Sequence, residues 1–408
     1  MTGTSPSPAL SSAAKLGGGA WDTDTQEVHG GQTWQLCGDA FVEDFSVTTN
    51  ALGAPAAALT AVRDALDRVH HYPPADCAKA LAHLSEFMGK WPTDQLLLGN
   101  GASEFIDLVM RVATREGGGA YRAGPFEAAY REYDRAATAA DRPTYSWHQV
   151  QRGLPDGHRI GVTVIIHPNS PTGDFTPLDQ LEAWIRQRQP CEAADAVFVI
   201  DESFMPFCGP DWRRHSALEL VARYPERVLV IHSWTKLWSC PGLRLGSVAA
   251  SRAWIRTLKR LQTPWSCNTL AQAFCAAAAK DKAYMQSTWQ LLPPWKRRQE
   301  QLLRAFPLRW AVNESSPVWV PWVYVDCGGE LVAERAHDAA LRAGCPVRWC
   351  RSFGRPQCLR LGVRSPEHQD VLMAAWRREF APDGVEEVDE RHRPGDDDVD
   401  SGRVSLTG

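Results

Sequence analysis

The spacing of hydrophobic residues in this chain is helical in its first third. Between 56 and 70 and between 78 and 88, apolar residues recur at intervals of three and four, which predicts two helices. The segment His71-Tyr72-Pro73-Pro74 separates them and predicts a turn.

Further along, the spacing changes to that of strands. Three short runs are nearly continuous, apolar and rich in β-branched residues: 161–167, 196–201 and 227–232. Strands buried on both faces of a parallel sheet have this composition, and helical patterns at 178–188 and 216–223 lie between the runs. The sequence therefore predicts an α/β fold with a central, mostly parallel sheet.

The last third predicts a second, smaller unit. Long helical patterns run from about 250 to 306, and residues 318–380 have the pattern of short strands and helices. We expect a disordered arm, an N-terminal segment with the large domain, a small C-terminal domain and an acidic disordered tail. These four parts are 1–28, 29–290, 291–382 and 383–408.

Charge and cysteine content narrow the class of protein. The 408 residues carry a formal net charge of -4, and the last 26 of them hold nine acids against three arginines, so the body is near neutrality. A body without a basic excess predicts no nucleic-acid partner. No apolar run approaches the ~20 residues that span a bilayer. The 11 cysteines include no CxxC pair and follow no signal-like segment, which favours reduced thiols in a cytoplasmic chain without a metal site.

Chemically useful side chains stand where the predicted strands end. Asp201 directly follows five apolar residues, where a carboxylate is costly unless a cation such as a protonated ring nitrogen faces it. Lys236 follows the next strand, and apolar and aromatic neighbours lower the pKa of a lysine enough for it to form a Schiff base. Because ligands bind beyond the carboxyl ends of parallel strands, we expect both residues in one pocket.

An anion site is predicted beside this pair. Arg244 and Ser233 offer a charge and a hydroxyl, and the turn at 99–104 opens a helix whose free N–H groups and dipole attract an anion. Singly, these residues have ordinary roles as a cap, a surface lysine or a turn. Together, at consecutive strand ends, they describe a pocket for a phosphorylated aldehyde with a basic ring nitrogen, which is pyridoxal 5'-phosphate.

The motifs at these strand ends resemble those of the fold-type I pyridoxal-phosphate enzymes of the class I/II aminotransferase superfamily. They are His-Pro-Asn-Ser-Pro-Thr-Gly at 167–173, Asp-Glu-Ser-Phe at 201–204, Ser-Trp-Thr-Lys at 233–236 and Pro-Gly-Leu-Arg-Leu-Gly at 241–246. The similarity covers about residues 29 to 377, and it is greatest to the branch of histidinol-phosphate aminotransferase and threonine-phosphate decarboxylase. It implies an aminotransferase-like fold, with a large domain around a mostly parallel sheet and a smaller C-terminal α/β domain.

The resemblance also implies how the cofactor is held. Lys236 would carry pyridoxal 5'-phosphate, Asp201 would pair with its ring nitrogen, and Tyr130 would stack on the ring. The remaining contacts would come from Gly101, Ala102, Ser103, Asn169, Ser170, Phe204, Ser233, Thr235 and Arg244. Of the adjacent pair Asn169 and Ser170, either one would contact the phenolic oxygen of the cofactor.

For the substrate and the assembly, the implied residues lie farther apart in sequence. Arg360 would bind the substrate α-carboxylate, with Asn50 nearby. Tyr72 would reach the phosphate of the neighbouring subunit's cofactor, which implies a homodimer with shared active sites. The candidates for the second anion of the substrate, a phosphate, are His29, Arg348 and Arg364.

Details of the motifs favour one activity of this branch over the other. His29-Gly30-Gly31, the segment 264–268 and Phe204, where most aminotransferases have tyrosine, resemble the decarboxylases. We therefore expect a decarboxylase that converts an O-phosphorylated or similarly anionic L-amino acid, such as threonine phosphate, into the amine and CO2. The alternatives are an aminotransferase of the histidinol-phosphate type and a non-catalytic relative that serves as a binding or scaffold protein.

Overall fold

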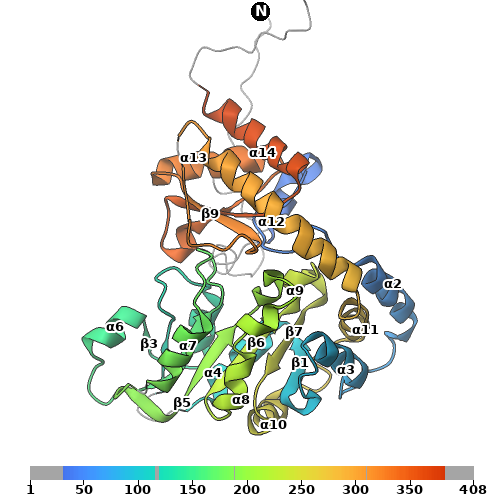
Figure 1. Cartoon of the computed structure of the whole chain (residues 1–408), viewed down its shortest axis with the longest axis vertical. Coiled ribbons are helices and arrows are strands. Elements are labelled where there is room, and N and C mark those ends of the chain that lie inside the picture. The colour runs from blue at the N-terminus through green and yellow to red at the C-terminus, as the bar shows by residue number, and fades with distance from the viewer. Residues whose placement is uncertain (1–30, 115–118, 188, 309, 382–408) are drawn as a thin grey trace, which may run out of the picture.

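A seven-stranded sheet forms the centre of the larger part of the molecule (Figure 1). The computed structural model describes residues 31–114, 119–187, 189–308 and 310–381. The expected N-terminal arm and acidic tail, and His29 among the site residues, lie outside these ranges. The strands of the sheet, in spatial order, are β1 (Leu96–Asn100), β7 (Leu245–Ala249), β6 (Val228–Ser233), β5 (Glu192–Asp201), β4 (Ile160–Ile166), β2 (Ala120–Arg122) and β3 (Thr144–Tyr145).

The sheet is mostly parallel, as the sequence predicts. Strands β3, β2, β4, β5 and β6 are parallel neighbours, whereas β7 is antiparallel to both β6 and β1. The three runs identified as buried strands are β4, β5 and β6, and every residue of β4 is buried. The fold is the α/β type that the sequence indicates.

Helices cover both faces of this sheet. Successive strand residues point to opposite faces, so Val197 and Val199 pack with α4, α5 and α10, whereas Phe198 and Ile200 pack with the helices of the other side. The helices of the large part are α2 (Ala56–Ala65), α3 (Ala78–Phe87), α4 (Ala102–Val112), α5 (Glu132–Ala139), α6 (Trp147–Arg152), α7 (Leu178–Arg186), α8 (Leu218–Arg223), α9 (Trp234–Leu237), α10 (Arg252–Leu261) and α11 (Thr269–Ala278).

A second, antiparallel sheet forms the smaller part, at the top of Figure 1. The long helix α12 connects the two parts and runs without a break through the expected boundary at residue 290. The N-terminal segment also joins this unit, because Phe45 pairs with Val347 and accepts a hydrogen bond from the N–H of Gly362 at 2.7 Å. The elements are α12 (Lys282–Arg304), β8 (Ala311–Val312), β9 (Trp322–Asp326), α13 (Glu330–Arg342), β10 (Arg348–Trp349), β11 (Cys358–Gly362) and α14 (Pro366–Glu379).

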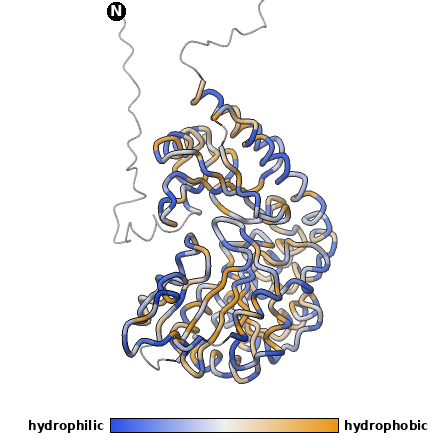
Figure 2. The backbone as a smooth tube through the Cα atoms, turned by 60° about the vertical axis from the view of Figure 1, so that its left-hand side comes forward, coloured by the Kyte–Doolittle hydropathy of each residue, from blue (hydrophilic) through white to orange (hydrophobic). Residues whose placement is uncertain are grey.

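Short 3-10 helices complete the described chain. They are η1 (Thr33–Ala40), η2 (Leu66–Arg68), η3 (Thr93–Gln95), η5 (Met205–Cys208), η6 (Trp212–His215), η7 (Pro241–Leu243) and η8 (Cys350–Phe353). The central strands are mostly apolar, whereas the outer helices alternate between hydrophobic and hydrophilic residues (Figure 2). Among the residues described, we find no helix whose length and apolar character would let it cross a membrane.

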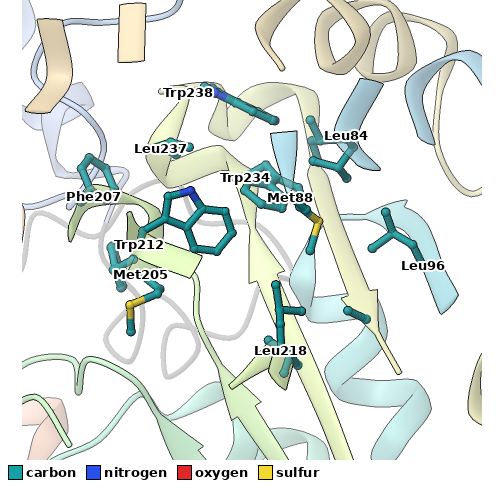
Figure 3. Close-up of a cluster of buried hydrophobic side chains, with 14 of the residues drawn as sticks. Leu84, Met88, Leu96, Met205, Phe207, Trp212, Leu218, Trp234, Leu237 and Trp238 are labelled. Carbon is teal, nitrogen blue, oxygen red and sulfur yellow. The ribbon is translucent and has the colours of Figure 1, made fainter. Parts of the chain in front are cut away.

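Several of the 17 tryptophans pack beneath the short helix α9 (Figure 3). Trp234 and Trp238, at its two ends, stack with ring centroids 5.0 Å apart, and both are fully buried with Trp212 and Leu237. Aromatic rings bury large apolar areas and have few rotatable bonds, so this cluster holds α9 in one place. The helix carries Lys236, whose position is fixed by that packing.

Candidate active site

The carboxyl ends of the central strands meet at one cavity of about 190 Å³. Ile166 at the end of β4 is paired in register with Asp201 at the end of β5, and Ser233 ends the neighbouring β6. Because parallel strands end at the same edge, residues far apart in sequence meet there. The predicted residues that line the cavity are Ala102, Ser103, Tyr130, Ser170, Asp201, Phe204, Ser233, Thr235, Lys236, Arg244, Arg348 and Arg360.

Asp201 lies at the floor of this cavity as a buried carboxylate with three hydrogen bonds. Ser203 donates to Oδ1 from its backbone N–H at 3.0 Å and from its hydroxyl at 2.6 Å, and the hydroxyl of Tyr133 donates to Oδ2 at 2.9 Å. Burial raises the pKa of Asp201, whereas these hydrogen bonds and the charge of Lys236 act in the opposite direction. The donors stabilise the charged form, which is the form that pairs with a protonated ring nitrogen.

Lys236 faces the same cavity from α9, one position before the end of the helix. Burial lowers its pKa from 10.5 to about 8, and the nearby charges of Arg360 and Arg244 act in the same direction, against that of Asp201. An amine with such a pKa is neutral in about one molecule in ten at pH 7, far more often than an ordinary lysine. A neutral amine is the form that attacks an aldehyde or accepts a proton.

The amino end of α4 and Arg244 form an anion cradle on one side of the cavity. Gly101, just before α4, has φ of +80°, and a Cβ there would lie 2.5 Å from Nη2 of Arg244, so the guanidinium rests against this turn. A Cβ on Gly246 would lie 2.4 Å from the backbone N of Ala102, which requires glycine in β7 for β7 and α4 to approach. The hydroxyls of Ser233 and Thr235, 2.7 Å apart, line the same cavity. Free N–H groups, a guanidinium and hydroxyls are a donor set suited to a phosphate.

Two buried arginines of the smaller part also line the cavity. Arg360 donates from Nη1 to Oγ of Ser170 at 3.0 Å and from Nη2 to the carbonyl of Ser46 at 2.9 Å, and its buried Nε has no hydrogen-bond partner among the residues that the structure describes. Burial, with the charge of Arg348 second, lowers the pKa of Arg360 to about 10. Arg348 donates to Oγ of Ser352 at 2.6 Å. Two guanidiniums that line the same cavity are a donor set suited to an anion.

Besides Gly101, which belongs to the cradle, and Tyr72, three predicted site residues within the described ranges do not line the cavity. Asn169 donates to the carbonyl of Ala128 and to Thr172, so Ser170 is the member of that pair that faces the cavity. Asn50 donates to the carbonyl of Leu237 and to Thr288, and its own N–H donates to the carbonyl of Lys236 at 2.9 Å. Asn50 therefore contacts the backbone of α9 at Lys236 and Leu237 and does not line the cavity.

Arg364 is the third, and its surroundings are those of a structural residue. The guanidinium is fully buried, pairs with Glu43 at 3.1 Å and donates to the carbonyls of Asp44, Val47 and Thr49. These contacts hold the N-terminal segment on the small domain. The placement does not support the prediction that Arg364 binds the second anion of the substrate, because its donors are directed at the protein backbone.

Tyr72 also lies away from the cavity of its own chain. It is 78% exposed and stacks on Trp265, with ring centroids 4.3 Å apart. Trp265 is itself exposed and follows α10 in the sequence. The two rings form a solvent-facing aromatic pair on the large part of the molecule.

The sequence reasoning missed several residues of the site. Tyr133 and Ser203 bond directly to Asp201, and Ser46, Val47, Thr48 and Phe353 line the cavity. Ser203 lies inside the Asp-Glu-Ser-Phe motif, two residues after Asp201, which is a signal for a local side-chain hydrogen bond. For Tyr133 the only sequence signal was its position three residues after Tyr130. Segment 46–48 carried no such signal, because only the tertiary fold brings it to the cavity.

The residues present fit pyridoxal 5'-phosphate. A phosphate cradle, a lysine with a lowered pKa and a buried carboxylate that accepts three hydrogen bonds surround one cavity. Within the described ranges, the buried Nε of Arg360 lacks a partner and could donate a hydrogen bond to a bound acceptor. Lys236 would hold the cofactor, Asp201 its ring nitrogen and the α4 cradle its phosphate.

Comparisons with known proteins agree with this chemistry. The histidinol-phosphate aminotransferase 2 of Ralstonia nicotianae is 29% identical over 340 residues, which are 81% of this chain and 87% of that protein. The fold matches the histidinol-phosphate aminotransferase of Sinorhizobium meliloti in complex with pyridoxal-5'-phosphate (TM-score 0.72, 16% identity, 85% of this chain and 93% of that one). It also matches the L-threonine-O-3-phosphate decarboxylase of Porphyromonas gingivalis (TM-score 0.69, 16% identity, 83% and 99%).

The match to a family profile covers most of the chain. Residues 42–375 match the family described as aminotransferase class I and II, and this range includes every residue of the cavity. The curated relatives are named aminotransferases, which favours the alternative activity over the decarboxylase that the motifs led us to expect. The chain belongs to the class I and II aminotransferase family and is an enzyme of fold type I that uses pyridoxal 5'-phosphate.

Proposed function

We propose that this protein is an aminotransferase whose amino substrate carries a phosphate or a similar anion, as histidinol phosphate does. The observation that carries the proposal is the pair Arg348 and Arg360, which lines the same cavity as the cradle of the cofactor phosphate. The names of the curated relatives support the same substrate class. Arg348 would bind the phosphate of the amino substrate, and Arg360 would bind a carboxylate of the amino acceptor.

The residues of the cavity divide the work of the reaction. When bound, pyridoxal 5'-phosphate withdraws electrons from the bonds at the substrate α-carbon. Lys236 in its neutral form accepts the proton from that carbon and returns it, because its lowered pKa is close to the working pH. Asp201 keeps a negative charge beside the ring nitrogen, and Tyr130 provides a ring that limits where the cofactor lies. Arg360 and Arg348 orient the substrate, which decides which bond is broken.

Decarboxylation remains a second candidate because of one residue. Phe204 lines the cavity at the position where most aminotransferases have a tyrosine, so a hydroxyl that would contact the cofactor is replaced by an apolar ring. Phe204 packs edge-on against Trp322, with centroids 4.5 Å apart, and is buried. This substitution is the detail that resembles the decarboxylases.

A substrate panel separates the two reactions. The purified enzyme with pyridoxal 5'-phosphate is incubated with histidinol phosphate, phosphothreonine or phosphoserine, with and without 2-oxoglutarate. Formation of glutamate that depends on both the amino substrate and 2-oxoglutarate supports the aminotransferase. Release of CO2 and amine without any acceptor supports the decarboxylase and contradicts the first proposal. Lys236→Ala should abolish either activity, and retention of activity would contradict the assignment of Lys236.

We also propose that the enzyme is a homodimer in which Tyr72 completes the partner's site. The exposed stacked pair Tyr72 and Trp265 supports this, because large exposed aromatic rings are typical of interfaces. Mixing Tyr72→Ala chains with Lys236→Ala chains creates hybrid dimers in which one site has both residues. Restoration to about a quarter of the wild-type activity is expected if the residue acts across the interface. No restoration, or a fully active monomer in sedimentation, would contradict it.

A further inference from the structure

The carboxylate of Asp201 accepts more hydrogen bonds from the protein than a simple partner for a ring nitrogen requires. A carboxylate has about four good acceptor positions, two on each oxygen. Three of them are occupied: two on Oδ1 by Ser203 and one on Oδ2 by Tyr133. One position, on Oδ2, is left for a ligand in the cavity.

These donors are themselves fixed in place. Oγ of Ser203 accepts a hydrogen bond from the N–H of Ser233 at 2.9 Å, so the hydroxyl is oriented to donate to Asp201. The ring of Tyr133 is 1% exposed in the core formed by α4, α5 and the strands. Because neither group is free to turn away, the carboxylate plane is held in one orientation.

We propose that Tyr133 and Ser203 are positioning residues that keep Asp201 ionised and aim its one open acceptor position at the ring nitrogen of pyridoxal 5'-phosphate. The charged and titratable side chains that face this carboxylate are Lys236 from α9 and Tyr130 and Tyr133 from the start of α5. The neighbouring Glu202 is engaged elsewhere, with His167, Ser216 and the N–H of Ala217. Within the described residues, Tyr133 and Ser203 are the side chains whose hydrogen bonds to Asp201 set how readily it takes up a proton.

The direction of the effect follows from the charge of the acceptor. A hydrogen bond to the ionised form lowers the pKa of a carboxyl group, and burial raises the pKa of Asp201. Removal of the Tyr133 hydroxyl leaves burial less opposed, so the carboxyl group becomes protonated at a higher pH. A protonated Asp201 cannot pair with a protonated ring nitrogen, and cofactor affinity therefore falls at a higher pH in the variant.

The test measures binding of pyridoxal 5'-phosphate to the full chain as a function of pH, without amino substrate. The same curve is measured for Asp201→Asn. Subtracting it from the wild-type curve leaves the loss of affinity that is due to Asp201, because the cofactor phosphate titrates in both proteins. We call this loss of affinity at low pH the acid limb. In Tyr133→Phe we expect the acid limb to move to a pH higher by about one to two units, because losing one hydrogen bond to a charged group shifts the pKa of that group by about this amount. Ser203→Ala should move it in the same direction.

Tyr121→Phe is the matched control. Tyr121 is a buried tyrosine of the same apolar cluster, but its hydroxyl bonds to Asp134 instead of Asp201. Its acid limb should stay at the wild-type pH. The series is repeated on a Lys236→Ala background, where the same shift is expected because the lysine is not its source. The melting temperature of each apo chain confirms that it is folded.

Two results would overturn the inference. One is an acid limb that does not move in a folded Tyr133→Phe protein, and the other is an equal movement in Tyr121→Phe. The inference rests on the cofactor and not on the reaction proposed above, so it stands or falls separately from the choice between transamination and decarboxylation.

Discussion

The amine of Lys236 should titrate far below an ordinary lysine, and this is the most direct prediction from the site. Burial and the charges of Arg360 and Arg244 lower its pKa to about 8. With that value, about one amine in ten is neutral at pH 7, against about one in three thousand for a lysine with a pKa of 10.5. The neutral, reactive fraction of this amine at pH 7 should therefore be about 300 times larger than with an ordinary pKa.

Two substitutions separate the causes of this shift. Arg360→Met removes a neighbouring positive charge, so the pKa of Lys236 should rise, by on the order of one unit. Asp201→Asn removes the negative charge that favours the ammonium form, so the pKa should fall by a similar amount. The two variants are predicted to move in opposite directions from the wild-type midpoint.

The assay is trace labelling of the apo chain with acetic anhydride over a range of pH. Mass spectrometry quantifies acetylation at Lys236 relative to the exposed Lys90 of the same molecule, which corrects for reagent loss. Circular dichroism confirms that each variant is folded. A wild-type midpoint near 10.5, or variants that move in the same direction, would refute the electrostatic account of this lysine.

Three further predictions concern the cofactor cradle, the substrate and the fold. Gly246→Ala should weaken binding of pyridoxal 5'-phosphate at least about tenfold in a fluorescence titration, because the added Cβ would lie 2.4 Å from the backbone N of Ala102. Wild-type affinity would contradict the assignment of this turn to the cofactor phosphate. Arg348→Met should raise KM for the phosphorylated amino substrate by about tenfold or more and change KM for 2-oxoglutarate less, whereas an equal rise in both would remove its specific role. Arg364→Ala should lower the free energy of unfolding in urea by on the order of 3 kcal/mol, because several buried carbonyls lose their donor, and an unchanged unfolding midpoint would show that these contacts contribute little.

The parts of the fold that the sequence predicted are those with a strong local pattern. The runs that became β4, β5 and β6 are apolar on both faces, and a segment of that kind has few stable alternatives to the interior of a parallel sheet. The antiparallel β7 within this sheet was not predicted, because its five residues do not show in which direction they pair. Direction is decided by partners that are distant in sequence.

The candidate site shows the same division. Asp201 and Lys236 follow apolar strands directly, so their place at the sheet edge was accessible from sequence, and both line the cavity. Arg360 and Arg364 are the same residue type and lie four positions apart. The guanidinium of Arg360 faces the cavity, whereas that of Arg364 donates its hydrogen bonds to backbone carbonyls. The sequence does not distinguish them, because the choice depends on where segment 43–49 packs.

By itself, the sequence determined the α/β class, the mostly parallel sheet and the cofactor chemistry, because continuous apolar runs, their length and the polar residues that follow them are local properties. The tertiary structure decided which arginines face the cavity, that Ser170 and not Asn169 lines it, and that Tyr133 bonds to Asp201. Those relations join residues that are tens to hundreds of positions apart. They exist only once the packing of the two parts has fixed the direction of each side chain.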